Sequence, residues 1–257
     1  MKIQLWRNAT VLLELNNKRL LLDPMLGAKG SMGLLPMIKE QQPNPLVDLP
    51  FSARELEAQL QHIDAVLLTH LHPDHWDLAA QELISKELPI ICSSLIAPDL
   101  NQQGFQNILV PDRELEWEGI QFSLTEGRHG SGEIGAMMGT VNGFVIKSGS
   151  EAAYFAGDTI WYEEINSILQ NFKPAFVVLN GGAAQFDQGE PILMTSEEII
   201  LAAQALPSSK FYIVHLEALS HAREDRGIIK SKISQNGLQN QCFVPADGEV
   251  IDTSDGH

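Results

Sequence analysis

Cysteine, positive charge and long apolar runs are all scarce in this sequence, and each shortage excludes a class of protein. The two cysteines, Cys92 and Cys242, are too few for a disulfide framework, and their spacing is not that of a thiolate zinc site. Cys92 lies in the apolar run 89–92 and is expected to be a small buried residue. No apolar stretch reaches the length of a membrane span, and residues 1–7 lack the apolar core of a signal peptide, so we expect a cytoplasmic protein.

Positive charge is the second shortage, because 17 Lys and Arg compare with 33 Asp and Glu, for a net charge of −16. A negative field of this size disfavours nucleic acid and anionic membrane surfaces as partners, but leaves small substrates open, anionic ones included. The 44% hydrophobic share of the 257 residues is that of an ordinary globular protein, with room for one large domain or two small ones. Nothing in the composition indicates the oligomeric state.

The expected strands and helices follow one order twice. An apolar hairpin at 11–15 and 18–22 precedes a segment at 25–51, rich in Gly, Pro and Met, that we expect to be an ordered loop. A helix then begins at Ser52, whose capping box is completed by Glu55. Further expected elements are strands at 65–68, 89–93, 108–110, 115–117 and 120–124, a helix from Asp77 to Lys86, a glycine-rich link, a hairpin at 141–147 and 152–156, a helix ending at Lys173, strands at 175–179 and 211–214, and a helix from Thr195 to Leu206. This order indicates two similar halves, divided near residue 135, packed sheet to sheet with helices outside.

A dense polar cluster follows the apolar run 65–68, which is expected to be a buried strand. It contains His70, His72, Asp74 and His75 within six residues. Burying so many polar groups is costly unless something binds them, and imidazole and carboxylate suit Zn, Mn or Fe. On an extended backbone His70 and His72 point the same way, whereas Asp74 and His75 follow a proline turn and can face a second ion. The alternative is a polar surface loop that happens to be rich in histidine.

Three further candidates, His129, Asp158 and His215, each lie just beyond the end of an expected strand. Loops past strand ends are where sites assemble in α/β sheets. Together with the cluster they supply five imidazoles and two carboxylates, which is a near-balanced set of ligands for two ions with room for water. Taken singly, His129 could be a surface residue, Asp158 a helix N-cap and His215 a core histidine.

The pattern His-x-His-x-Asp-His, followed by a lone His, an Asp and a last His, resembles the metallo-β-lactamase superfamily. The spacing and the flanks of Gly157-Asp158-Thr159 are most similar to its branch of metal-dependent hydrolases that includes the ascorbate-6-phosphate lactonase-like proteins. The resemblance implies a single domain, 1–257, with a four-layer αββα sandwich of two mixed sheets and a site along one edge. It also implies one ion held by His70, His72 and His129, a second held by Asp74, His75 and His215, and Asp158 as the bridge between them.

The activity implied by the resemblance is hydrolysis by a hydroxide that bridges two divalent metal ions, Zn first, with Mn or Fe as alternatives. Asp74 is expected to pass a proton to the leaving group as well as to ligate. A small-molecule ester, in first place a lactone, is the expected substrate, because this branch contains a sugar-phosphate lactonase. Phosphodiester hydrolysis is the second choice. A non-haem iron oxidoreductase and a non-catalytic metal-binding protein are the alternatives from other classes.

Weaker signals surround this set. Asp23 ends the second strand and is expected either to orient a ligand imidazole or to serve as a plain turn residue. His221 could reach the substrate as a second catalytic residue, although six positions after His215 it would leave that face of a helix, so a solvent or capping role is the alternative. The remaining candidates are Arg128 as an anchor for an anion or a surface salt-bridge partner, Trp76 and Trp161 as pocket or packing residues, and His62 and His257 as surface residues.

Overall fold

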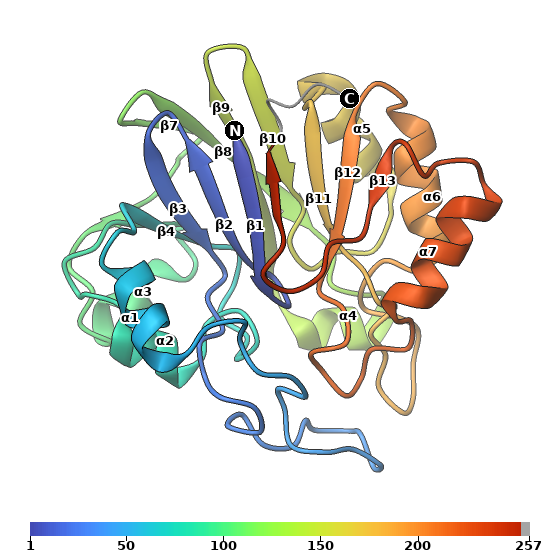
Figure 1. The fold of residues 1–257 in the computed structure, drawn as a ribbon, viewed down its shortest axis with the longest axis horizontal. Helices are drawn as coiled ribbons and strands as arrows, with labels where there is room; N and C mark the ends of the chain where they lie inside the picture. The colour runs from blue at the N-terminus through green and yellow to red at the C-terminus, as the bar shows by residue number, and fades with distance from the viewer. Residues whose placement is uncertain (253–257) are drawn as a thin grey trace.

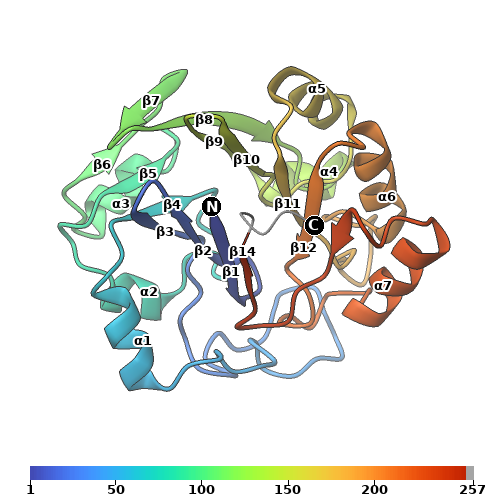
Figure 2. The ribbon, with the colours of Figure 1, turned by 45° about the horizontal axis from the view of Figure 1, so that its top comes forward.

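The computed structural model describes residues 1–252, which form two seven-stranded sheets packed face to face with helices outside (Figures 1 and 2). The strand orders are β14-β1-β2-β3-β4-β5-β6 in the first sheet and β13-β12-β11-β10-β9-β8-β7 in the second. Each sheet joins an antiparallel part to a parallel part, at β3 and at β10 respectively. The predicted αββα sandwich of two mixed sheets is therefore confirmed.

The first half begins with a meander of three strands and continues with parallel strands joined by helices. The predicted hairpin turns at Asn16 and Asn17, both of which have left-handed φ angles, of 51° and 58°. The predicted helix after Asp77 ends at Leu83 and not at Lys86, because Ile84 takes an extended backbone and buries its side chain in the core. The elements are β1 (Lys2–Arg7), β2 (Thr10–Leu15), β3 (Lys18–Leu22), α1 (Ala53–Leu60), β4 (Ala65–Leu68), α2 (Leu78–Leu83), β5 (Ile90–Cys92), α3 (Ala97–Gln102) and β6 (Ile108–Leu109).

The second half repeats this order. The glycine-rich link that the sequence indicated contains a short helix, α4, whose Ile134 and Met138 pack on a small apolar cluster that local propensity does not reveal. The elements are β7 (Glu114–Trp117), β8 (Ile120–Gly127), α4 (Gly132–Met138), β9 (Val141–Ser148), β10 (Glu151–Phe155), α5 (Glu163–Phe172), β11 (Phe176–Asn180), α6 (Ser196–Ala205), β12 (Lys210–Val214), α7 (Arg226–Gln235), β13 (Cys242–Phe243) and β14 (Val250–Asp252).

Three apolar layers hold the sandwich together. The middle layer lies between the sheets and includes Leu13, Leu67, Phe122 and Phe155. One outer layer packs under α1, α2 and α3, and the other packs under α5, α6 and α7 (Figure 1). Because the strands are fixed on both faces, the loops at their ends have well-defined starting points.

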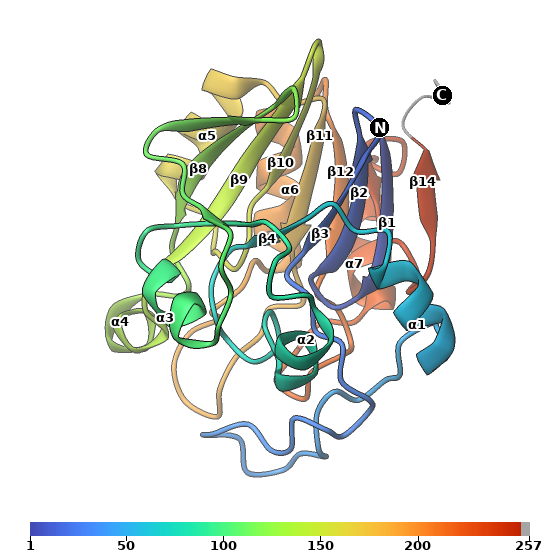
Figure 3. The ribbon, with the colours of Figure 1, turned by 90° about the vertical axis from the view of Figure 1, so that its left-hand side faces the viewer.

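The ends of β4, β8, β10 and β12 meet at one edge of the sandwich, below which the loop of residues 23–52 hangs (Figure 3). The N-terminus and the last described residues lie at the opposite end (Figures 1 and 3). Among residues 1–252, none of the helices combines the length and the apolar character that crossing a membrane requires.

Arg7 fastens the long loop at its base. The side chain is fully buried, and its Nη1 donates to the carbonyl of Val47 at 3.0 Å while Nη2 donates to those of Met25 and Gly27 at 2.8 Å. One guanidinium thus joins both arms of the loop. Burial lowers the pKa of Arg7 to about 10, so it remains charged at neutral pH.

Candidate metal centre

The seven candidate ligands lie in two adjacent groups, and in each group the ligand atoms are all within 4.8 Å of one another. His70 and His72 follow β4, and His129 follows β8; these three form one group. The second group is Asp74, His75, Asp158 and His215, so it draws on the same β4 loop and on the ends of β10 and β12. The structure therefore brings together all seven candidates from four strand ends.

Asp158 lies between the two groups. Its Oδ2 is 3.2 Å from Nε2 of His75 and 3.8 Å from Nε2 of His215 on one side. On the other side the same oxygen is 3.3 Å from Nε2 of His129 and 3.9 Å from Nε2 of His70. A carboxylate oxygen in this position would be shared by cations held in the two groups. Gly157 delivers it there with a φ of 67°, where a Cβ would lie 2.6 Å from the Asn142 carbonyl oxygen.

Hydrogen bonds to Nδ1 orient three of the imidazoles. His129 Nδ1 donates to the Ile192 carbonyl and His75 Nδ1 donates to Asp23, both at 2.9 Å. Thr69 Oγ1 donates to Asp23 at 2.7 Å, so it accepts from His70 Nδ1 at 3.0 Å. In the neutral form of each ring the proton is then on Nδ1, and the Nε2 lone pair points into the cluster, as a metal ligand needs.

Two asparagines that sequence reasoning missed support the carboxylates. Asn180 Nδ2 donates to Asp158 Oδ1 at 2.7 Å. Asn8 Nδ2 donates to the backbone carbonyl of Asp74 at 3.2 Å and lies 3.5 Å from its Oδ2, and the backbone carbonyl of Asn8 accepts from the backbone N–H of His215 at 2.9 Å. Asn180 directly follows an expected strand, as the candidate ligands do, so its position in the sequence could have indicated a role at the site. No pattern in the sequence indicated such a role for Asn8.

The charges of the cluster suit a cation. Burial lowers the pKa of His70 and of His129, so these rings are neutral, and Nε2 of His70 lies 2.9 Å from Nδ1 of His72. Burial also lowers the pKa of His75, but the carboxylates of Asp158, Asp74 and Asp23 outweigh it and raise that pKa well above its usual value. Burial raises the pKa of Asp158, but His75, His215 and His129 together hold it well below its usual range. Asp74 is likewise held ionised, against the effect of burial, first by His75.

The donor set also passes a direct test of fit. Nε2 of His75 is buried without a hydrogen-bond partner among the described residues, although it lies 3.4 Å from Asp74 Oδ2 and 3.2 Å from Asp158 Oδ2. A buried nitrogen beside two carboxylates needs either a proton of its own, which the raised pKa of His75 favours, or a cation that it shares with them. The residues present therefore fit divalent ions with imidazole and carboxylate ligands.

Backbone strain gathers around the site. Asp23, Ala183, His215 and Glu217 have φ angles of 43°, 46°, 64° and 64°, a region that residues other than glycine seldom adopt. Such conformations cost free energy and persist where the surroundings impose them, commonly at functional sites. At His215 the strained backbone turns the chain directly after β12, at the point where the side chain enters the cluster.

The weaker candidates fall into separate places. Asp23 contacts His75, as the prediction of an orienting carboxylate requires. His221 is buried in a non-helical segment, so the alternative of a solvent-exposed role is wrong. Trp76 is a core residue bonded to Gln103. Of the others, Trp161 packs partly buried against the second outer layer, Arg128 is exposed with its guanidinium 4.2 Å above the Tyr162 ring, His62 is exposed, and His257 lies outside the described residues.

Removing the charge of Asp23 is expected to weaken metal binding. Its carboxylate accepts from His75 Nδ1, from the Thr69 hydroxyl and from the Thr69 backbone N–H, so Asp23→Asn disturbs the orientation of a candidate ligand. Loss of such a partner costs about 10–100-fold in metal affinity. Competition with a fluorescent zinc chelator measures it, with Asp99→Asn on exposed α3 as the control. An unchanged affinity would make Asp23 a plain turn residue.

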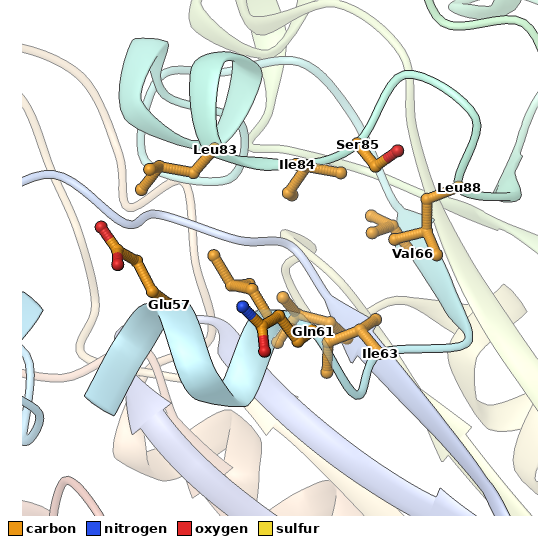
Figure 4. A pocket seen from close by; sticks show the side chains of 10 residues that line it. Glu57, Gln61, Ile63, Val66, Leu83, Ile84, Ser85 and Leu88 are labelled. Carbon is orange, nitrogen blue, oxygen red and sulfur yellow. The ribbon is translucent and has the colours of Figure 1, made fainter. Parts of the chain in front are cut away.

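Two of the cavities among the described residues differ in their relation to the cluster. A cavity of about 640 Å³ beside His129 is lined by Arg128, Ser131, Thr140 and Asn142, among others. A second, of about 380 Å³, lies between α1 and the end of α2, where Glu57 and Gln61 lie opposite Leu83 and Ile84 (Figure 4). The residues that line this second cavity include none of the candidate ligands, so it is not part of the candidate metal centre.

Two seven-stranded mixed sheets between helices, with a His/Asp cluster at one edge, define the class of metal-dependent hydrolases with the metallo-β-lactamase fold. The model of the family "Beta-lactamase superfamily domain" matches residues 18–216. The chain belongs to this superfamily.

Individual relatives extend the likeness over the whole chain. The UPF0173 protein YddR of Bacillus subtilis (strain 168) is 37% identical over 254 residues, which cover 97% of this chain and 98% of that one. A UPF0173 metal-dependent hydrolase of Ignicoccus hospitalis is 27% identical, over 81% of this chain and 88% of its own. Among solved structures, an isothiocyanate hydrolase from Delia radicum gut bacteria has a TM-score of 0.89 and 34% identity, covering 98% of both chains. These relatives support the prediction of a metal-dependent hydrolase.

Proposed function

We propose that the protein is a dinuclear hydrolase that attacks an electrophilic carbon of a small molecule, in first place the carbonyl of a lactone. One ion would be held by His70, His72 and His129, and the other by Asp74, His75 and His215, with Asp158 shared. The supporting observation is the position of Asp158 Oδ2, within 3.9 Å of imidazole nitrogens of both groups. Bound there, zinc or a similar divalent ion lowers the pKa of water and polarises the bond under attack.

Asp74 is the proposed proton carrier. It is held ionised and its side chain is 13% exposed, whereas the side chains of His75, Asp158 and His215 are at most 3% exposed. An ionised carboxylate at the open side of the cluster accepts a proton from the attacking water. It then passes that proton to the leaving alcohol oxygen as the ester C–O bond breaks.

His221 is the second proposed catalytic residue. Burial lowers its pKa to about 4, so the ring is neutral at pH 7, and the charges of Asp74 and Asp158 act on it. Its Nδ1 is buried and has no hydrogen-bond partner among the described residues. A neutral imidazole with unused hydrogen-bonding capacity near the cluster is suited to hold a polar group of the substrate.

The surroundings support a small substrate. The cavity beside His129, of about 640 Å³, is within the range that small ligands occupy. Exposed Arg128 lines this cavity and is suited to an anionic group on the substrate. An apolar cluster adjoins the site on another side, through Ile192, whose carbonyl holds His129, and Phe186, whose ring lies 6.0 Å from that of His221.

Isothiocyanate hydrolysis is the second candidate function. It is favoured by the 34% identity to an isothiocyanate hydrolase and by the apolar cluster of Phe186, Ile192 and Leu193, since isothiocyanates are largely apolar electrophiles. Water adds to the central carbon of R–N=C=S, and the products are the amine R–NH2 and carbonyl sulfide. The same cluster and the same proton carrier serve both reactions, because both begin with water attacking an unsaturated carbon.

A substrate panel tests these assignments. Protein loaded with Zn, Mn or Fe is assayed with γ- and δ-lactones, aryl and alkyl isothiocyanates, a phosphodiester, a thioester and a β-lactam. We expect turnover of a lactone or an isothiocyanate that disappears in His70→Ala, whose cluster lacks one ligand. Turnover of the phosphodiester alone would replace both candidates. Oxygen consumption by the iron-loaded protein without hydrolysis would favour the oxidoreductase alternative.

A further inference from the structure

The loop of residues 23–52 packs along the segment that carries His221. Leu46 N–H donates to the Ala218 carbonyl at 2.8 Å, and Met25, Met32 and Val47 form an apolar cluster with Ala218 and Leu219. Figure 3 shows the loop beneath the sandwich, at the end where the strands deliver the candidate ligands. The loop is thus packed against the segment that carries His221 and does not project freely into solvent.

Asn44 makes the most specific of these contacts. Its side chain is fully buried, and Oδ1 accepts the backbone N–H of Ser220 at 2.8 Å. Nδ2 lies 3.2 Å from the Ser220 hydroxyl and donates to the Gly33 carbonyl at 3.1 Å. The amide therefore connects two parts of the loop, at Gly33 and at Asn44 itself, to Ser220, which is 176 positions further along the chain. Gln41 adds a bond from the Ser220 hydroxyl to its Oε1, at 3.0 Å.

His221 is the next residue after Ser220, and its own ring is weakly held. Nδ1 has no hydrogen-bond partner among the described residues, and the ring packs against Phe186 at a centroid distance of 6.0 Å. The position of the ring is instead fixed through the backbone on either side of it. Asn44 holds Ser220, and the backbone carbonyl of His221 accepts the N–H of Gln185 at 3.0 Å. Moving either anchor moves the imidazole relative to the candidate metal ligands.

We propose that Asn44 is a positioning residue for the reaction, which holds His221 at its working place through Ser220. This inference rests on the proposed catalytic role of His221. The proposal gives the loop of residues 23–52 a function. The buried amide of Asn44 would fix the position of His221, which lies more than 170 positions further along the chain. Alanine at position 44 removes both the acceptor for Ser220 N–H and the donor to Gly33, and leaves the candidate ligands untouched.

A double-mutant cycle tests the proposal. Misplacing a reacting group by about 1 Å costs on the order of 100-fold in rate, so we expect Asn44→Ala to lower kcat by about 10–100-fold with a smaller change in KM. In a His221→Ala background the same substitution should change kcat by less than about 2-fold, since the group it positions is gone. Asn101→Ala, on exposed α3, is the matched control and should leave kcat unchanged.

A merely structural role gives a different pattern: Asn44→Ala would then lower kcat by the same factor in both backgrounds, and this would overturn the proposal. Should Asn44→Ala not fold, Gln41→Ala replaces it, because this variant removes the acceptor for the Ser220 hydroxyl together with the bonds of Gln41 to Leu35 and Ile38 within the loop. Its smaller loss must also vanish in the His221→Ala background, and a loss that persists there would likewise overturn the proposal.

A readout without turnover separates this proposal from the proposed function. In ¹H–¹³C spectra of histidine-labelled protein, the His221 signal, assigned by its absence in His221→Ala, should shift in Asn44→Ala while that of exposed His62 does not. If the signal shifts in a protein that hydrolyses no substrate, the result would support the positioning of His221 by Asn44 and contradict the proposed function. If the signal does not shift in an active enzyme, the result would contradict the positioning role of Asn44 and leave the proposed function standing.

Discussion

Asp158→Asn is expected to abolish measurable turnover and leave the fold intact. The substitution keeps the shape of the side chain, and the site of its bond to Asn180 lies within the hydrogen-bonding reach of an amide. The substitution removes the negative charge of the carboxylate. In the parent protein, Oδ2 of this carboxylate lies within 3.9 Å of four imidazole nitrogens from the two groups. Without that shared charge the second cation has Asp74 as its one anionic ligand, so we expect no more than one tightly bound ion per chain.

Three measurements check this prediction. Elemental analysis gives the metal content per chain, circular dichroism gives the fold, and the substrate found in the panel gives the rate. Asp112→Asn, an exposed aspartate in a turn, is the matched control and should behave as the parent protein. A variant at position 158 with full activity would show that this carboxylate is not a shared ligand, and the dinuclear proposal would fall.

Removing the metal is expected to lower Tm by about 10 °C as well as to stop turnover. Three of the four members of one group, His75, Asp158 and His215, are buried, so their charges and lone pairs have little access to water without an ion. An ion present at about 1,000 times its Kd stabilises the folded state by about 4 kcal/mol. For a chain of this size each kcal/mol corresponds to roughly 2–4 °C in Tm.

Thermal scans with and without EDTA measure this shift, followed by re-addition of Zn, Mn or Fe to restore both Tm and turnover. The His70→Ala variant is the internal control, because it lacks one ligand of the first group and its Tm should respond less to EDTA. Identical Tm values for the parent protein in the two scans would contradict a tightly bound metal, whatever the assays show.

The sequence was sufficient for the general fold and for naming the seven candidate residues that the structure brings together. The apolar runs and capping boxes are local patterns, and those at 11–22, at Ser52 and at Thr195 all appear in the structure. The cluster from His70 to His75 is also local, so its polar density was visible without coordinates. Six elements were not predicted: β1, although its first four residues alternate polar and apolar side chains, and α3, α4, α7, β13 and β14, which are short or have a weak apolar period.

Only the tertiary structure decided how these residues act together. The Thr69–Asp23, His129–Ile192 and Asn44–Ser220 bonds join segments 46, 63 and 176 positions apart, and sequence spacing carries no information about such contacts. His221 illustrates the limit, because its spacing from His215 was judged on a helix, whereas the packing of residues 23–52 holds that segment in turns and buries the ring. Residue types and local periods set which chemistry is available; long-range packing sets which atoms meet.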